Sequence, residues 1–83
     1  MDNTILAEIK QIIINNIRSD LNIDDLNGNY QLIGNILDSM AVNTLILELE
    51  HKYGFTFNDD DLQAEYFETL STLTELVARK ISG

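Results

Sequence analysis

The sequence predicts an all-α fold of four helices, with a long loop between the first two and a short third helix. Apolar residues recur at helical spacing in three segments, near residues 4–18, 39–52 and 70–81. Between the first two of these segments, Asp, Asn and Gly residues interrupt the pattern over residues 19–37. The chain contains no proline, so none of the predicted helices is interrupted by one.

The first helix is expected from about Thr4 to Arg18, with one face turned toward the core. Its expected core stripe consists of Leu6, Ile9, Ile13 and Ile17, widened by Ile5 and Ile12. Ile14 lies outside the stripe and is expected at an exposed or edge position. In the following loop, isolated apolar side chains are expected to hold the backbone against the core: Leu21, Ile23, Leu26, Leu32 and Ile33.

The second helix is expected from Ser39 to Lys52, with Gly54 as its C-terminal stop. Asp38 is well suited to the N-cap position, where its carboxylate accepts hydrogen bonds from amides of the first turn. Ser39 then occupies the first helical position, and a phosphate attached to it would lie near the positive end of the helix dipole. An Asp-Ser pair before an apolar run is also typical of a simple helix cap.

The third and last helices are expected in the second half of the chain. Asn58 can cap the short third helix, because the three aspartates that follow it complement the helix dipole. The last helix is expected to begin near Thr69 or Ser71 and to end near Ile81. The expected core residues of this half are Tyr53, Phe55, Phe57, Phe67, Leu70, Leu73, Leu76 and Val77.

Residues 32–40, Leu-Ile-Gly-Asn-Ile-Leu-Asp-Ser-Met, resemble the attachment motif of acyl and peptidyl carrier proteins, commonly Gly-x-Asp-Ser-Leu or Leu-Leu-Asp-Ser-Leu. The similarity continues through residues 49–55, 57–62 and 66–73, so it covers nearly the whole chain. It implies a four-helix carrier-protein bundle wrapped by the long loop. In that family the serine carries 4′-phosphopantetheine, whose terminal thiol holds the cargo as a thioester. Ser39 is the matching position, Asp38 would help to present it, and Met40 replaces the usual leucine.

Composition limits the remaining possibilities. Eighty-three residues make one expected domain, over residues 1–83. Fourteen acidic against five basic residues give a net charge of −9, which disfavours binding to nucleic acid and to anionic membranes. Without cysteine, any thiol chemistry has to come from a prosthetic group. The N-terminus lacks a secretory pattern and the longest apolar run is far shorter than a membrane span, so a cytoplasmic location is expected.

Catalysis by the chain itself is not expected. Hydrolysis through Ser39 would need a nearby base and an orienting acid. His51, the sole histidine, follows twelve residues later on the same expected helix, which places it roughly 18 Å away.

No metal site is expected either. A calcium-binding loop of the EF-hand type needs glycine at its sixth position. Loops starting at Asp59 or at Asp20 have Ala64 or Asp25 at that position.

The expected partner surface lies on the second helix. Carriers of fatty-acid synthesis typically place acidic residues two and five positions after the serine, and here these positions hold the neutral residues Ala41 and Thr44. Helical spacing places an apolar stripe beside Ser39, with acidic residues at its rim. The partner-binding residues expected from this pattern are Met40, Ala41, Thr44, Leu47, Glu48, Glu50 and His51.

The resemblance implies several partners for a monomeric chain. A phosphopantetheinyl transferase would attach the arm, an adenylating ligase or acyltransferase would load it, and downstream biosynthetic enzymes would use the cargo. The neutral residues near Ser39 favour a discrete aminoacyl, peptidyl or specialised acyl carrier. A fatty-acid or polyketide-type acyl carrier is the alternative, and an unmodified acidic interaction module is the alternative of another class.

Overall fold

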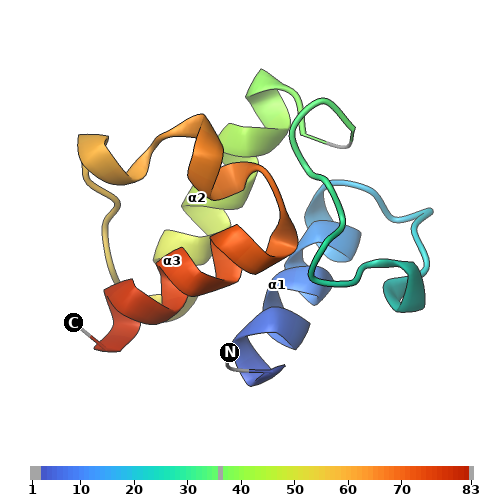
Figure 1. Ribbon diagram of the computed structural model, residues 1–83, viewed down its shortest axis with the longest axis horizontal. Helices are drawn as coiled ribbons and strands as arrows, with labels where there is room; N and C mark the ends of the chain where they lie inside the picture. Colours follow the sequence, from blue (N-terminus) through green and yellow to red (C-terminus); the bar gives the residue numbers. More distant parts are fainter. Residues whose placement is uncertain (1–2, 36, 83) are drawn as a thin grey trace.

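Three α-helices, joined by loops and short 3-10 turns, make up the computed structural model, which describes residues 3–35 and 37–82 (Figure 1). The helices are α1 (Asn3–Asn16), α2 (Ser39–Tyr53) and α3 (Leu70–Ser82). The 3-10 turns are η1 (Ile23–Asp25), η2 (Asp59–Asp61) and η3 (Ala64–Phe67). The predicted all-α class and the long loop between the first two helices are therefore confirmed.

The prediction of a short third α-helix is wrong. Two separate 3-10 turns, η2 and η3, occupy its place, so the described residues contain three α-helices where the sequence predicts four. The backbone of Gln63 is extended, which separates the two turns. The Asp61 carboxylate accepts a hydrogen bond from the Asn58 amide at 2.9 Å and closes the first turn locally. Segments this short cannot offset the cost of starting an α-helix, so tertiary contacts determine their shape.

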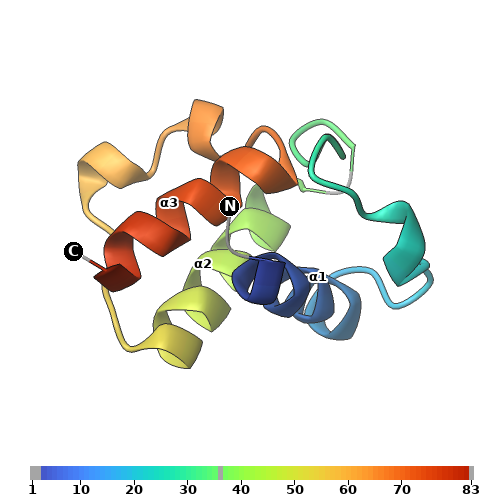
Figure 2. The same ribbon diagram turned by 60° about the horizontal axis from the view of Figure 1, so that its bottom comes forward.

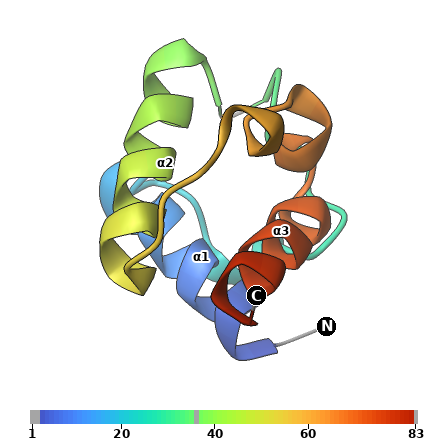
Figure 3. The same cartoon turned by 90° about the vertical axis from the view of Figure 1, so that its left-hand side faces the viewer.

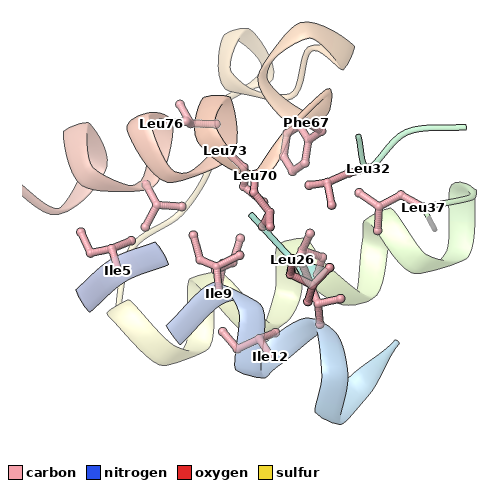
Figure 4. Packing of buried hydrophobic residues seen from close by; sticks show 14 of the residues in the cluster. Ile5, Ile9, Ile12, Leu26, Leu32, Leu37, Phe67, Leu70, Leu73 and Leu76 are labelled. Atoms are coloured by element: carbon pink, nitrogen blue, oxygen red, sulfur yellow. The ribbon is translucent and has the colours of Figure 1, made fainter. Parts of the chain in front are cut away.

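The hydrophobic core lies between the three helices and the long loop (Figure 4). All four predicted core residues of α3 are buried, together with Leu45 and Leu49 of α2. From the loop, Leu26 and Leu32 are fully buried and Leu37 nearly so. The full set of buried apolar residues is Ile5, Ile9, Ile12, Ile13, Leu26, Leu32, Leu37, Leu45, Leu49, Phe57, Phe67, Leu70, Leu73, Leu76 and Val77.

Several predicted core positions are shifted in the structure. The buried stripe of α1 is centred on Ile5, Ile9, Ile12 and Ile13, while Leu6, Ile14 and Ile17 are only partly buried against the core. Tyr53 and Phe55 are also partly buried, and Ile23 is exposed instead of anchoring the loop. These shifts depend on which neighbours cover each side chain, which spacing along one helix does not specify.

A set of backbone hydrogen bonds joins the long loop to the start of α3. The Leu32 amide donates to the carbonyl of Glu68 at 2.7 Å. In return, the amides of Leu70 and Ser71 donate to the carbonyls of Tyr30 and Gly28, at 3.2 and 2.8 Å. The first amides of a helix have no partner within the helix, so the loop satisfies two of them. We call these three hydrogen bonds the loop–α3 seam.

A tight turn leads from this seam to α2. The carbonyl of Leu32 accepts hydrogen bonds from the amides of Asn35 and Leu37, at 3.1 and 3.0 Å. Gly34 has a φ of 83° within this turn, a conformation that residues with a Cβ adopt at a cost. The turn therefore fixes where the chain enters α2, directly after Leu37.

The start of α2 lies at the opposite end of the molecule from the start of α1 and the end of α3 (Figures 1 and 3). After α2, the chain runs back along the molecule, so that η3 and the residues directly before it lie near the N-terminal half of α2 (Figure 3). When the molecule is turned so that its bottom comes forward, α1 and α3 are seen on either side of the C-terminal part of α2 (Figure 2). Within the described ranges, no helix has the length and hydropathy needed to cross a membrane.

Replacing either positive-φ glycine by alanine is expected to destabilise the protein without a steric clash. Gly34 and Gly54 both have positive φ, and a Cβ built on either one meets no atom within 4 Å. Each substitution should therefore lower the free energy of unfolding by about 1–2 kcal/mol through backbone strain alone. Urea denaturation measures this loss.

Amide hydrogen exchange distinguishes the effects of the Gly34 and Gly54 substitutions. Gly34→Ala should speed exchange of the Leu37 amide, which bonds within the same turn, and Gly54→Ala should leave that amide unchanged. Unchanged stability of Gly34→Ala would show that this turn does not constrain the entry into α2.

Candidate functional site

Ser39 lies at the N-terminus of α2, on an exposed surface. The residue before it, Asp38, is the N-cap: its Oδ1 accepts a hydrogen bond from the Ala41 amide at 2.8 Å. The Asp38 carbonyl accepts a hydrogen bond from the Val42 amide at 2.9 Å, which is the first backbone hydrogen bond of the helix. The turn at Gly34 and the cap at Asp38 together place Ser39 on the surface, at the first position of α2.

This geometry suits a serine that a separate enzyme modifies rather than one that is activated as a catalyst by residues of its own chain. A group bearing negative charge on Ser39 would lie at the positive end of the α2 dipole. His51 is exposed near the other end of α2, roughly 18 Å along the helix, so it cannot take the Ser39 proton. Within the described residues, no group of three or more His, Asp or Glu side chains is arranged to hold a metal ion.

A cavity of about 530 Å³ opens beside Ser39. Apolar side chains dominate its lining, and Asp38, Ser39, Asn43 and Gln63 supply the polar ones. Its volume falls within the range usual for small-molecule sites. The lining residues are Ile33, Leu37, Asp38, Ser39, Val42, Asn43, Ile46, Leu62, Gln63, Ala64 and Phe67.

Spacing in the sequence gives no indication of this cavity. Its walls come from the loop, from α2 and from the segment between η2 and η3, which lie far apart in the chain. Val42 and Ile46 are half-buried residues that also pack against the core. The third wall, at Leu62, Gln63 and Ala64, is exposed.

An ion pair joins this third wall to α3. The Asp61 carboxylate lies 2.8 Å from Lys80 Nζ, and both side chains are about four-fifths buried, with 18% and 20% exposed. The hydrogen bond from Lys80, together with that from the Asn58 amide, lowers the pKa of the Asp61 carboxyl. A comparable pair on the surface, Arg18 with Asp20, also lowers the pKa of its carboxyl but is well exposed to solvent.

Four of the predicted partner-binding residues lie together at the C-terminal half of α2. Leu47, Glu48, Glu50 and His51 line a surface hollow of about 400 Å³, together with Phe55 and Thr56. Leu47 is 64% exposed, which is high for a leucine in a helix. The hollow therefore combines an open apolar surface with acidic groups.

The other predicted partner-binding residues are more dispersed. Met40 is 80% exposed next to Ser39, and the Thr44 hydroxyl donates to the Met40 carbonyl at 3.1 Å. Ala41 faces a different hollow, which it shares with Arg18 and Asp38.

Glu50 has a structural contact in addition to its place in the hollow. Its Oε2 accepts a hydrogen bond from the Phe57 amide at 2.9 Å, so it fixes the chain that leaves α2. Of the two acidic residues in the hollow, Glu48 is therefore the better probe of charge alone, because changing Glu50 also removes this contact.

Comparison with known proteins assigns the chain to a family. The model of the phosphopantetheine attachment site family matches residues 7–79. A holo acyl carrier protein from Nitrosomonas europaea, solved by solution NMR, has a similar structure with a TM-score of 0.84. The two chains are 35% identical, and the match covers 94% of this chain and 96% of the other. No curated protein sequence matches the chain.

The chain therefore belongs to the family of phosphopantetheine-binding carrier proteins. Its members carry 4′-phosphopantetheine covalently and work with phosphopantetheinyl transferases and biosynthetic enzymes. The domain is a carrier and not an enzyme.

The Asp61–Lys80 pair makes stability depend on pH in a defined direction. Because the folded state lowers the pKa of Asp61, the pair stabilises the protein fully above the ordinary aspartate value of about 3.9. This contribution is lost as the pH falls through the lowered pKa of the folded state. Asp61→Asn should therefore lower the Tm at pH 7, and the difference from the wild type should shrink below about pH 4. Thermal unfolding followed by circular dichroism measures both, and a difference that persists unchanged at pH 2 would contradict the assignment.

Proposed function

We propose that Ser39 carries the 4′-phosphopantetheine arm of this carrier protein, with Asp38 holding it at the start of α2. The observation that supports this most directly is the exposed serine directly after an N-cap aspartate, within a family defined by such an attachment site. In the reaction, Ser39 Oγ attacks the phosphorus next to the pantetheine of coenzyme A, and its proton passes to a base of the phosphopantetheinyl transferase. The bond to the adenosine bisphosphate breaks, and a phosphodiester to Ser39 remains.

The proposed role is to hold an acyl or aminoacyl intermediate as a thioester on this arm. A tethered intermediate meets successive enzymes at high effective concentration and does not diffuse away. The cavity beside Ser39 supports the proposal, because its apolar lining can enclose part of a cargo that starts at the same rim. Between deliveries, the cargo would be shielded from water in this cavity.

We further propose that partners dock mainly on an apolar surface of α2. Met40 and Leu47 are its most exposed large residues, and Ala41 and Thr44 leave the helix without charge near Ser39. Apolar anchors that become buried contribute most of the binding energy in protein interfaces, and rim charges chiefly affect association rates. This surface favours a dedicated aminoacyl, peptidyl or specialised acyl pathway. A fatty-acid type of carrier is the alternative, favoured by the similarity to an acyl carrier protein.

Substitution of Ser39 tests the attachment site. Incubation with coenzyme A and a broad-specificity phosphopantetheinyl transferase should add one phosphopantetheine to the wild type, as measured by intact mass. Ser39→Ala should block the addition and leave the Tm nearly unchanged, because an exposed hydroxyl contributes little to packing. Ser71→Ala is the matched control and should be modified as fully as the wild type. Full modification of Ser39→Ala would overturn the proposal.

Substitution of Leu47 tests the docking surface. Leu47→Asp should slow loading by the cognate ligase or acyltransferase by at least about tenfold, because it places a charge on a buried contact. It should hardly change the Tm, since this side chain is 64% exposed in the free protein. Glu48→Lys should have a smaller effect, mainly at low ionic strength. The opposite ranking would favour the fatty-acid type of carrier.

A further inference from the structure

The outer wall of the cavity beside Ser39, formed by Leu62, Gln63 and Ala64, is exposed to solvent. Leu62 is 43% exposed, and Gln63 and Ala64 are exposed as well. The hydrogen bonds of this segment are local: the Asp61 and Leu62 amides donate to the carbonyls of Asn58 and Asp59 at 3.0 and 3.2 Å. Such bonds hold each turn together but do not attach the segment to a helix.

The Asp61–Lys80 ion pair supplies that attachment. Among the hydrogen bonds and ion pairs of described residues 58–63, it is the one that reaches an α-helix. Lys80 belongs to α3, which is fixed in the core by Leu76 and Val77. Asp61 directly precedes the wall residues Leu62 and Gln63, so the pair connects this wall to a helix that is packed in the core.

The opposite wall of the cavity, formed by α2, is fixed by the core. Val42 and Ile46 belong to α2, and they lie on the same broad face of this helix as the fully buried residues Leu45 and Leu49. Displacing α2 would open the core, which costs several kcal/mol for each large apolar side chain involved. An occupant larger than the cavity would therefore displace the 58–63 segment.

We propose that the Asp61–Lys80 ion pair holds the 58–63 segment in place, and with it the outer wall of the cavity at Leu62 and Gln63, and thereby limits the length of acyl chain that the cavity encloses. The inference rests on the proposed carrier function, because it requires a cargo attached at Ser39. The pair is more buried than the other two ion pairs of the described residues, Lys52–Glu8 and Arg18–Asp20. Partial burial reduces the screening of this pair by salt, whereas an exposed pair is screened and contributes little.

Loading the protein with acyl chains of different length tests this limit. A transferase would attach acetyl-, hexanoyl- or decanoyl-phosphopantetheine to the wild type and to Lys80→Met, from the corresponding acyl-coenzyme A. Lys80→Met removes the charge and keeps an apolar side chain of similar length. The control is Lys52→Met, which breaks a salt bridge to Glu8 away from the cavity lining. The measured quantity is the rise in Tm over the protein that carries the arm without an acyl group.

In the wild type, hexanoyl should raise the Tm more than acetyl, and decanoyl should add nothing further. In Lys80→Met, decanoyl should raise the Tm more than hexanoyl, while Lys52→Met should follow the wild type. Asp61→Asn serves as a second variant if Lys80→Met does not fold, because it removes the same ion pair from the other side.

Amide hydrogen exchange gives an independent readout in the protein with the bare arm. Exchange of the Leu62 amide should become about tenfold faster in Lys80→Met, while the Ser71 amide in the loop–α3 seam should be unaffected.

Three results would overturn the inference. The first is the same length profile in Lys80→Met and in the wild type. The second is a wild type in which decanoyl already stabilises more than hexanoyl. The third is a wild type in which no acyl chain changes the Tm, because the cavity then takes no cargo. In all three cases the mass of the arm on Ser39 shows separately whether the proposed carrier function stands.

Discussion

The docking of the long loop on the start of α3 is the constraint on which the functional site depends. In the loop–α3 seam, the carbonyls of Gly28 and Tyr30 accept the first amides of α3, and the Leu32 amide bonds back to Glu68. The seam therefore satisfies helix amides that would otherwise lack partners and also fixes the loop. Leu26, Leu32 and Leu37, which lie before, within and after the seam along the chain, are buried in the core. Together with the seam, they fix the position at which the chain enters α2. The position of Ser39 and one wall of the cavity follow from that entry.

The site combines two requirements that a carrier protein places on one small domain. Ser39 has to be exposed, so that transferases and later enzymes reach the arm, and the α2 cap places it at the rim. The cargo is better protected when it lies in an apolar environment, and the adjacent cavity offers one. Burial of Leu45 and Leu49 keeps the α2 wall of that cavity rigid, whereas the wall at Leu62 and Gln63 directly follows Asp61, which is paired with Lys80 of α3.

Local features were predictable from the sequence, and contacts between distant segments were not. The cap at Asp38, the stop at Gly54 and the buried face of α3 depend on neighbouring residues, so their pattern is visible in the chain. The cavity and the two 3-10 turns depend on contacts across the fold, such as that between Asp61 and Lys80. The aspartate run 59–61 predicts a helix start, and the Asp61 carboxylate does bond to the amide of the N-cap Asn58, but Asp61 also pairs with Lys80 of α3 and the helical turn ends at Asp61.

The mass of the protein as its native cell makes it tests most directly whether Ser39 carries the phosphopantetheine arm. Intact-mass measurement, followed by fragmentation of the peptide that contains Ser39, reports the arm, its position and any cargo in one experiment. We expect a single phosphopantetheine on Ser39, with a fraction of the molecules carrying an additional acyl or aminoacyl group. A chain that is unmodified in its native cell, or that carries the arm on another residue, would contradict it.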